Sequence, residues 1–194
     1  MRELQQLVRE GSATISSKRL GDRLGFTASQ IRKDFAYFGQ FGRPGIGYHC
    51  EELVRKIRSI LGTDRTWPVV LVGCGNLGQA LLGYRGFSPQ GFELVAAFDV
   101  ADELVGGQVG ATEILHLSRL SEVVEQKKVR VAILAVPAEA AELAVDAIVQ
   151  AGITGILNFA PVTLTLPKHV GIVEVDLARE LEQLAFTVLQ RDEG

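Results

Sequence analysis

A short apolar run that leads directly into three spaced glycines constrains this chain more than any other feature. Residues 69–72 are Val-Val-Leu-Val, and Gly73, Gly75 and Gly78 follow with the spacing G-x-G-x-x-G. Gly73 permits a tight turn, Gly75 lets the backbone approach a pyrophosphate, and Gly78 lets a helix pack close to the strand. The phosphates would lie at the helix N-terminus, where free N–H groups and the helix dipole favour an anion. The pattern predicts a dinucleotide-binding strand–loop–helix unit.

An acidic residue follows at the position that such a unit requires. Asp99 comes after a second predicted strand, Phe92 to Phe98, and its carboxylate is expected to accept both hydroxyls of the adenine ribose. Neither Arg nor Lys follows closely to hold a 2′-phosphate, and Asp102 and Glu103 add negative charge. We therefore predict NAD(H) and not NADP(H) as the cofactor; the alternative is a sheet turn that needs only glycines. The loop residues assigned to the nucleotide are Gly73, Cys74, Gly75, Asn76, Leu77 and Gly78.

Strands and helices alternate through residues 68–175. Strands are predicted at 69–72, 94–98, 129–136, 155–158 and 171–175, and helices near 79–82, 119–126 and 139–150. This alternation is typical of an α/β fold with a doubly wound parallel sheet, in which ligands bind outside the carboxyl ends of the strands. Two loops at those ends are therefore predicted to line the nicotinamide side, through Val136, Pro137, Asn158, Phe159, Ala160 and Pro161.

The first third of the chain is basic and helical. Residues 1–67 hold twelve Lys and Arg against seven Asp and Glu, although the whole chain carries a net charge of −3. A basic segment ahead of an acidic one favours contact with a polyanion. Helices are predicted over Arg2 to Glu10 and Lys18 to Leu24, and Thr27 to Gln30 fits a capping box that opens a helix reaching about Phe38. Two short helices joined by a glycine-containing turn predict a helix-turn-helix; a plain helical hairpin is the alternative.

The second of these helices carries side chains suited to base edges and phosphates. They are Ser29, Gln30, Arg32, Lys33 and Tyr37, opposite an apolar line that holds the helix on its neighbour. Residues 39–48 follow, with four glycines, one proline and Arg43. A glycine-rich hairpin of this kind is expected to act as a wing at a minor groove, and an ordinary loop is the alternative. A further amphipathic helix, 51–61, leads to a linker at 62–66.

The last segment, 176–194, predicts an amphipathic helix. Its apolar stripe would cover its own sheet or pack on a second subunit, and the two-fold symmetry of DNA half-sites favours the second subunit. The chain shows no apolar run near the roughly 20 residues that span a bilayer, and its N-terminus lacks the apolar core of a signal peptide. Cys50 and Cys74 fall in different predicted domains, so a disulfide is not expected. We predict a cytoplasmic protein.

Catalytic chemistry has no clear signature in the sequence. His49, His116 and His169 are scattered, without a nucleophile or metal-ligand partner at a suitable spacing. Cys74 allows two interpretations, a thiol activated by the helix N-terminus or a small side chain that fits the loop. A cofactor site without evident chemistry, behind a basic helix-turn-helix, predicts a sensor and not an enzyme.

Several motifs together resemble the Rex family of redox-sensing repressors. They are Ser16-Ser17-Lys18-Arg19-Leu20, Gln30-Ile31-Arg32-Lys33-Asp34, Tyr37-Phe38-Gly39, Gly45-Ile46-Gly47-Tyr48, the loop 73–78 and Asn158-Phe159-Ala160-Pro161. The resemblance implies a winged-helix domain at 1–62, a Rossmann domain at 68–175 and a C-terminal helix at 176–194 that is exchanged in a homodimer. It also implies a repressor that binds double-stranded operator DNA when free or NAD⁺-bound and releases it on binding NADH.

The resemblance also assigns individual roles. It places Ser16, Ser17, Lys18, Gln30, Arg32, Lys33, Tyr37, Arg43, Gly45 and Gly47 at the DNA, and Arg2, Tyr84 and Asp176 at an interface between domains and subunits. Two alternatives remain open, a small NAD-dependent dehydrogenase with a basic appendage and a CoA- or nucleotide-binding ligase subunit. The capping box and the glycine-rich wing argue against both, because neither enzyme needs them.

Overall fold

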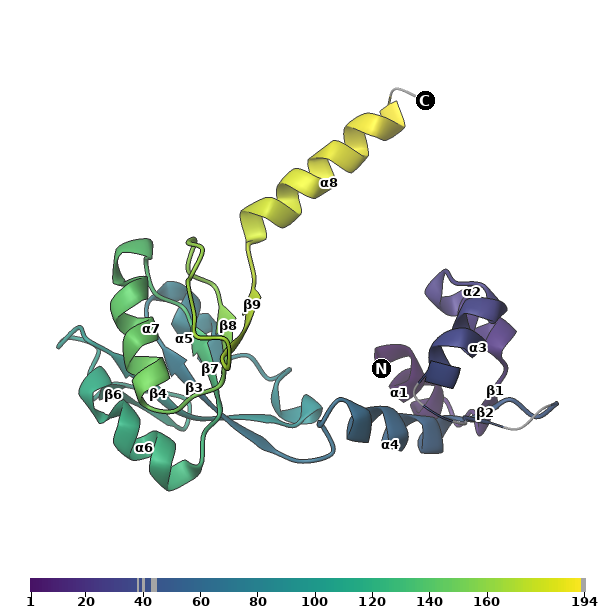
Figure 1. Cartoon of the computed structure of the whole chain (residues 1–194), viewed down its shortest axis with the longest axis horizontal. Helices are drawn as coiled ribbons and strands as arrows, with labels where there is room; N and C mark the ends of the chain where they lie inside the picture. Colours follow the sequence, from purple (N-terminus) through teal and green to yellow (C-terminus); the bar gives the residue numbers. More distant parts are fainter. Residues whose placement is uncertain (38, 40, 43–44, 193–194) are drawn as a thin grey trace. The chain divides into compact units, whose positions relative to one another are not determined.

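The computed structural model describes residues 1–37, 39, 41–42 and 45–192. Contacts divide the chain into two compact units, Met1–Arg65 and Thr66–Gly194, and each is described by itself (Figure 1). Within the described ranges, none of the helices combines the length and apolarity that crossing a bilayer requires.

The first unit is helical, with one small antiparallel sheet. Its elements are α1 (Arg2–Arg9), β1 (Thr14–Ile15), α2 (Ser17–Leu24), α3 (Ala28–Tyr37), β2 (Tyr48–His49) and α4 (Cys50–Ile60). The spacing of apolar residues puts one face of each helix into a shared core, built around Leu7, Ile15, Leu20, Ile31 and Leu53. Gly25 ends α2 in the left-handed conformation (φ +74°), where a side chain would be strained. The predicted pair α2–α3 is therefore present, joined by a glycine-containing turn.

The short strand that follows the predicted wing pairs with a distant segment of the chain. Tyr48 and His49 pair with Ile15 and Thr14, which lie ahead of α2, and not with a strand inside the glycine-rich segment. The described part of residues 39–47 contains no strand, and Gly47 is its one bridge residue. The wing hairpin itself stays a prediction, because residues 40, 43 and 44 within it lie outside the described residues. Arg43 and Phe38 lie outside the described residues.

The second unit is built on a seven-stranded sheet with the order β5-β6-β4-β3-β7-β8-β9. The strands are β3 (Trp67–Val72), β4 (Phe92–Asp99), β5 (Gln108–Val109), β6 (Thr112–His116), β7 (Val131–Leu134), β8 (Gly155–Asn158) and β9 (Gly171–Glu174). All neighbours pair in parallel except β5 with β6. The order turns outward in both directions from β3 and β7, so the predicted doubly wound parallel sheet is present.

Helices cover both faces of this sheet. They are α5 (Asn76–Leu82), α6 (Leu120–Lys127) and α7 (Ala141–Gln150), with short 3₁₀ turns η1 (Ser88–Gln90), η2 (Leu117–Arg119) and η3 (Ala138–Ala140). Alternate residues of β3 face opposite sides, as the strand period requires. Val70 and Val72 pack in one core with residues of α6 and α7, while Val69 and Leu71 pack in another with residues of α5. The central strand β3 is therefore covered on both sides.

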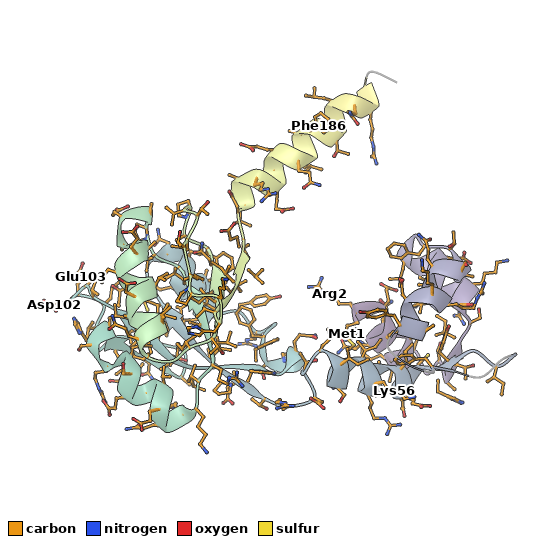
Figure 2. The ribbon with its side chains drawn as sticks, viewed as in Figure 1. Met1, Arg2, Lys56, Asp102, Glu103 and Phe186 are labelled. Carbon is orange, nitrogen blue, oxygen red and sulfur yellow. The ribbon has the colours of Figure 1, made fainter. Side chains whose placement is uncertain are left out.

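Helix α8 (Leu177–Asp192) is exposed along its whole length. Every residue from 177 to 191 is exposed, including the apolar members of the predicted stripe. The predicted stripe consists of Leu177, Leu181, Leu184, Ala185, Val188 and Leu189, and its Leu and Val members are each at least half exposed. Phe186, labelled in Figure 2, lies outside the stripe and is also exposed. The rest of the second unit therefore does not cover the stripe.

Candidate functional site

The carboxyl ends of the central strands meet in one row. Register pairs Val72 with Phe98 on one side and with Leu134 on the other, and it pairs Leu134 with Asn158. A backbone hydrogen bond of 2.8 Å from the N–H of Gly73 to Phe98 O extends the row into the glycine loop. The glycine loop, Asp99 and both predicted nicotinamide-side loops therefore leave the same edge of the sheet.

Each glycine of the loop meets a different steric demand. Gly73 has a φ of +97°, and a Cβ there would overlap the carbonyl oxygen of Ala135. A Cβ on Gly78 would overlap the carbonyl oxygen of Gly73, so the first turn of α5 packs directly on the loop. Gly75 is exposed, with nothing within 4 Å of the position that a Cβ would take. That open side, next to the first N–H groups of α5, leaves room for a phosphate group.

Asp99 lies next to the glycine loop and also holds it in place through hydrogen bonds. Its Oδ2 accepts from the N–H of Cys74 at 2.6 Å, and its Oδ1 accepts from Val100 and Ala101 at 2.8 and 3.0 Å. Three of the roughly four lone-pair sites of the carboxylate are thus used by the protein. Sequence reasoning placed Asp99 correctly at the end of β4, but it missed this role in holding the loop.

The thiol of Cys74 faces the core and not the nucleotide side. Cys74 is fully buried, and its Sγ lies 3.5 Å from Phe98 O. Burial and, to a smaller extent, the nearby charge of Asp99 raise the pKa of this thiol to about 12. The activated-thiol interpretation is therefore wrong, because a reactive thiolate needs a lowered pKa. Only the backbone of Cys74 belongs to the loop that faces a ligand.

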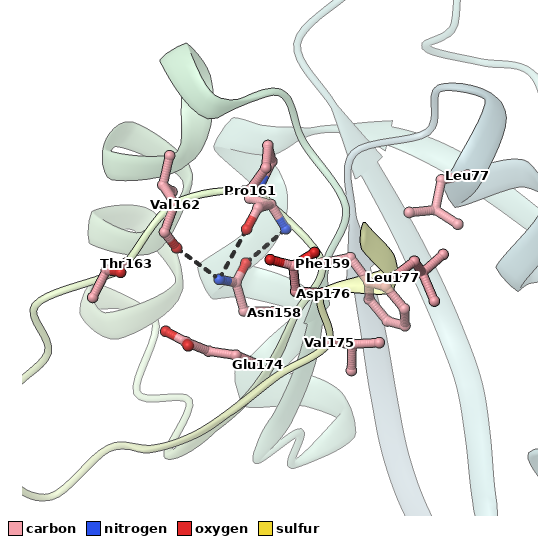
Figure 3. Close-up of a pocket in the computed structure, with 11 residues that line it drawn as sticks. Leu77, Asn158, Phe159, Pro161, Val162, Thr163, Glu174, Val175, Asp176 and Leu177 are labelled. Carbon is pink, nitrogen blue, oxygen red and sulfur yellow. Dashed lines mark hydrogen bonds between the residues drawn. The ribbon is translucent and has the colours of Figure 1, made fainter. Parts of the chain in front are cut away.

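A cavity of about 340 Å³ lies beyond the loop, at the ends of β8 and β9 (Figure 3). It is lined by Leu77 of α5, by Asn158, Phe159, Ala160, Pro161, Val162 and Thr163, and by Glu174, Val175, Asp176 and Leu177. The predicted residues 158–161 are all present in its wall. Thr163, Glu174 and Leu177 were not predicted, because they belong to no recognisable motif. Thr163 reaches the cavity through the loop after β8, and Glu174 and Leu177 reach it through the pairing of β9 with β8.

Two predicted nicotinamide-side residues lie elsewhere. Val136 is half-buried against the glycine loop, where its Cγ1 would crowd a Cβ on Gly73. Pro137 is exposed and precedes η3. Neither lines the cavity, although both leave the same sheet edge.

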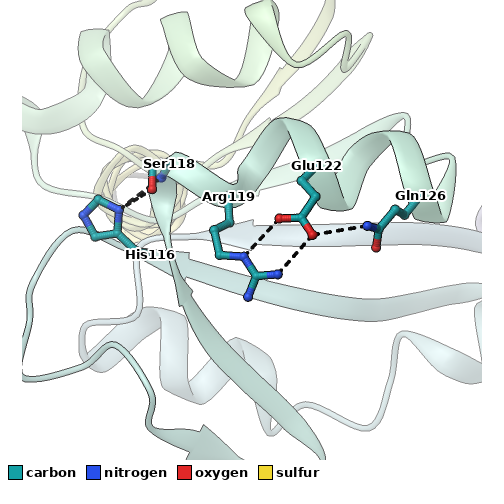
Figure 4. A network of polar contacts seen from close by, with 5 residues as sticks. All are labelled: His116, Ser118, Arg119, Glu122 and Gln126. Atoms are coloured by element: carbon teal, nitrogen blue, oxygen red, sulfur yellow. Dashed lines mark hydrogen bonds and ion pairs between the residues drawn. The ribbon is translucent and has the colours of Figure 1, made fainter.

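The polar network at the corner of β6 and α6 is local (Figure 4). His116 caps η2, since its Nδ1 accepts from the backbone N–H of Ser118 at 3.2 Å and lies 2.8 Å from that residue's hydroxyl. Arg119 forms an exposed ion pair with Glu122 at 3.1 Å, which lowers the pKa of the Glu122 carboxyl. His116 therefore has a structural role here, as expected from the sequence.

Helix α3 begins with the predicted capping box. The side chain of Thr27 accepts from the N–H of Gln30 at 3.2 Å, and the Gln30 side chain accepts from the N–H of Thr27 at 2.9 Å. Ile31 is buried in the core of the first unit, which fixes the opposite face of α3 outward. The capping bond uses the Gln30 carbonyl oxygen, so only its NH₂ group remains to donate outward.

The outward face of α3 carries the predicted DNA contacts. Ser29, Gln30, Arg32, Lys33 and Tyr37 are all exposed. A hollow of about 710 Å³ runs between α3 and the glycine-rich segment, lined among others by Ser16, Ser17, Arg32, Gly45 and Gly47. Lys18 is exposed but does not line it. Within the hollow, Arg32 donates to the hydroxyl of Ser17 at 3.1 Å, which links α3 to the start of α2.

Comparison with known proteins covers both units. Residues 64–162 match the family model described as "CoA binding domain", and residues 1–36 match one described as "Putative DNA-binding protein N-terminus". The redox-sensing transcriptional repressor Rex of Pelotomaculum thermopropionicum is 42% identical over 191 residues, which cover 98% of this chain and 90% of that protein. The Rex of Carboxydothermus hydrogenoformans is 44% identical over 187 residues, or 96% and 90% of the two chains. The chain belongs to the Rex family of redox-sensing transcriptional repressors.

Solved Rex structures share the fold of this chain. The structure of the Rex-family repressor RSP in complex with β-NAD⁺ and operator DNA superimposes with a TM-score of 0.93 at 35% identity, covering 98% of this chain and 88% of that one. The complex of RSP with β-NADH gives 0.88 at 34% identity, covering 98% and 89%. The expected architecture of an N-terminal DNA-binding domain followed by a Rossmann-type domain is confirmed at the level of the Rex fold.

The three interface residues that the Rex resemblance assigned lie in different units. Arg2 is exposed at the start of α1 in the first unit, whereas Tyr84 and Asp176 belong to the second. The ring of Tyr84 contacts Phe87 edge-on at 4.9 Å. Asp176 caps α8, because its Oδ1 accepts from the N–H groups of Ala178 and Arg179 at 2.9 and 3.1 Å. Their joint role in a Rex interface stays a prediction.

Proposed function

We propose that this chain is a transcriptional repressor that senses the NADH/NAD⁺ ratio. It binds operator DNA when free or carrying NAD⁺, and it releases the DNA on binding NADH. The observation that carries the proposal is the combination, in one chain, of an exposed basic face on α3 with an open glycine loop beside Asp99. Rex relatives span nearly the whole chain, and RSP was solved with NAD⁺ and operator DNA and also with NADH.

The geometry of the glycine loop fits a dinucleotide. The first N–H groups of α5 and the open side of Gly75 would hold the pyrophosphate. Asp99 keeps about one lone-pair site on Oδ2 for a ribose hydroxyl, and its charge repels a 2′-phosphate, which selects NAD(H). NADH and NAD⁺ differ only in the nicotinamide ring, whereas Asp99 would bind the adenine ribose. The residues that distinguish the two redox forms must therefore lie away from Asp99. We place it in the cavity at the ends of β8 and β9.

We propose a homodimer in which α8 packs on a second copy of the chain. The exposed apolar stripe supports this arrangement, because a helix with one apolar face gains stability only when that face is covered. Nucleotide and DNA sites lie in different units, so NADH acts by changing the relation between units or subunits. A coupling of about 1–3 kcal/mol would change operator affinity roughly 5- to 150-fold.

The dehydrogenase alternative is the weaker one. Relatives across nearly the full chain length carry the name of a repressor, and operator binding would place the protein in the cytoplasm with the DNA. We expect no turnover of NADH with small carbonyl or hydroxyl substrates. The CoA-binding alternative rests on the name of the matched domain family, and Asp99 argues against it by favouring a ribose whose hydroxyls are both free.

A gel-shift assay on genomic DNA fragments tests the proposed function. We expect retained fragments without ligand and with NAD⁺, and their release on adding NADH but not NADPH or CoA. Retention that no nucleotide changes would contradict redox sensing, and absence of any retained fragment would contradict DNA binding. Release by CoA alone would favour the CoA- or nucleotide-binding ligase subunit.

A further inference from the structure

Asn158 has an unusual place in the second unit. Its exposed fraction is 2%, and it is the one polar or charged residue that counts as buried in the described ranges. It ends β8, at the wall of the cavity shown in Figure 3. A buried amide of this kind must have its hydrogen-bonding groups paired, because each unpaired group is costly.

All polar atoms of the Asn158 side chain are used within its own loop. Its Nδ2 donates to the carbonyl oxygens of Ala160 and Val162, both at 3.2 Å, and its Oδ1 accepts from the N–H of Ala160 at 2.8 Å. An amide group has two N–H donors, so neither remains for a ligand. The side chain fixes the path of the backbone that carries Phe159 to Thr163.

The backbone of Asn158 holds the opposite wall. Its carbonyl oxygen accepts from the N–H of Val175 at 2.8 Å, and Asn158 pairs in register with Glu174 on β9. Val175 leads directly into Asp176 and Leu177, where α8 begins. One residue therefore connects the loop after β8 with the segment that starts α8, and both segments line the cavity.

We propose that Asn158 is a positioning residue that gives the cavity its selectivity between NADH and NAD⁺. This replaces the sequence-based assignment of Asn158 as a direct cofactor contact, and it rests on the proposed function, which places the nicotinamide in this cavity. NADH and NAD⁺ differ only in the nicotinamide ring. If the cavity wall is no longer held in place, we expect the cavity to bind both forms of the ring with similar affinity. The adenosine half is bound at Asp99 and the glycine loop, on the other side of β3, and does not depend on this frame.

Calorimetry on the full-length protein with ADP-ribose, NAD⁺ and NADH tests the proposal. Asn158→Asp keeps the shape but replaces both donors with an acceptor, and Asn158→Ser keeps one acceptor in case the buried charge prevents folding. In both variants we expect the ratio of the NAD⁺ and NADH dissociation constants to move toward 1 by about tenfold. This size corresponds to loss of the hydrogen bonds to the carbonyl oxygens of Ala160 and Val162. ADP-ribose affinity should change less than about twofold.

Two further measurements make the result decisive. Val123→Ala removes buried methyl groups from α6 without touching the cavity, so it should leave the ratio unchanged despite lower stability. Hydrogen exchange of the ligand-free Asn158 variants should be faster at residues 159–163, which a residue acting only by contact with the ring would not cause. Three results would each overturn the proposal: unchanged hydrogen exchange at residues 159–163, an unchanged ratio of the NAD⁺ and NADH dissociation constants, or binding of ADP-ribose weakened as much as that of NADH. An unaltered protein that binds NADH and NAD⁺ equally would instead contradict the proposed function.

Discussion

Asp99 has a structural role in the glycine loop and, in the proposed function, also binds the ribose. It ties the N–H of Cys74 to the end of β4 and caps the turn at Val100 and Ala101. Loss of the carboxylate therefore removes a ribose partner and also frees the glycine loop. Hydrogen bonds to a charged group contribute roughly 1.5–3 kcal/mol, so we expect Asp99→Ala to weaken NADH binding by one to two decades in calorimetry.

A second substitution separates these roles. Asp99→Asn keeps one carbonyl oxygen for the turn and removes the charge, so it should improve binding of NADPH relative to NADH more than Asp99→Ala does. Equal affinity of the unaltered protein for NADH and NADPH would contradict the assignment of Asp99.

The buried thiol of Cys74 makes the stability of the second unit dependent on alkaline pH. Its pKa is raised to about 12 in the folded chain, above the ordinary value of 9.0. Above pH 9 the unfolded chain loses this proton while the folded chain keeps it, so the free energy of unfolding falls as the pH rises toward 12. Denaturant unfolding at several pH values should show a smaller fall for Cys74→Ala. An equal fall in both proteins would assign the effect to other groups.

At the scale of elements, we expect α3 to make a large contribution to operator binding. Arg32→Ala and Lys33→Ala should each lower operator affinity and reduce the salt dependence by about one unit per lost phosphate contact. NADH affinity should hardly change, because these residues lie in the first unit. Filter binding across a salt series measures both quantities, and Lys56→Ala on α4 serves as a control for general charge. Unchanged operator binding in either variant would mean that the recognition helix is misassigned.

The start of α8 depends on Asp176 as its cap. Asp176→Ala should cost about 1 kcal/mol of helix stability, whereas Asn at this position caps as well as Asp. We expect both Asp176→Ala and Asp176→Asn to leave a dimer whose operator release by NADH is altered, because the charge takes part in the interface implied by the Rex resemblance. An operator titration across NADH concentrations checks this. A normal response of Asp176→Asn would reduce the role of Asp176 to capping.

Elements with strong local signals were predictable, and elements fixed by distant partners were not. The capping box at Thr27 predicted the start of α3, and the apolar run at 155–158 matches β8 at both ends. Strands β5 and β6 were missed, since β5 has only two residues and β6 has no regular alternation of apolar and polar residues. Strand β7 was predicted over 129–136 but covers Val131–Leu134, because an apolar run does not mark where pairing stops.

Across the whole molecule, the sequence predicted which motifs lie together better than what their residues do. Parallel strands end at one edge, so the motifs alone place Gly73, Asp99 and the loop after β8 together. The use of the Asn158 amide within its own loop depends on a turn conformation that has no sequence signature. The same holds for Glu174 and Leu177, which reach the cavity only through the pairing of β9 with β8.

Deletion of α8 tests the proposed dimer. A chain that ends at Val175 should no longer dimerise properly and should bind operator poorly, because two half-sites would no longer be held by one particle. Light scattering gives the mass, and operator titration with NADH gives the response. A truncated protein that stays dimeric and releases DNA at the same NADH concentration would refute this mechanism. ADP-ribose binding, which depends on the glycine loop, provides the control for folding.

A newly synthesised copy of this chain would leave the ribosome with the apolar stripe of α8 uncovered. Chaperones and proteases act on chains with such incomplete structure, so a copy without a partner stays open to removal. In the proposed homodimer, association would protect the stripe by mass action, and this protection would grow with the number of copies present. The turnover of such a repressor would then depend on its own abundance, and a cell with few copies would lose them faster than a cell with many.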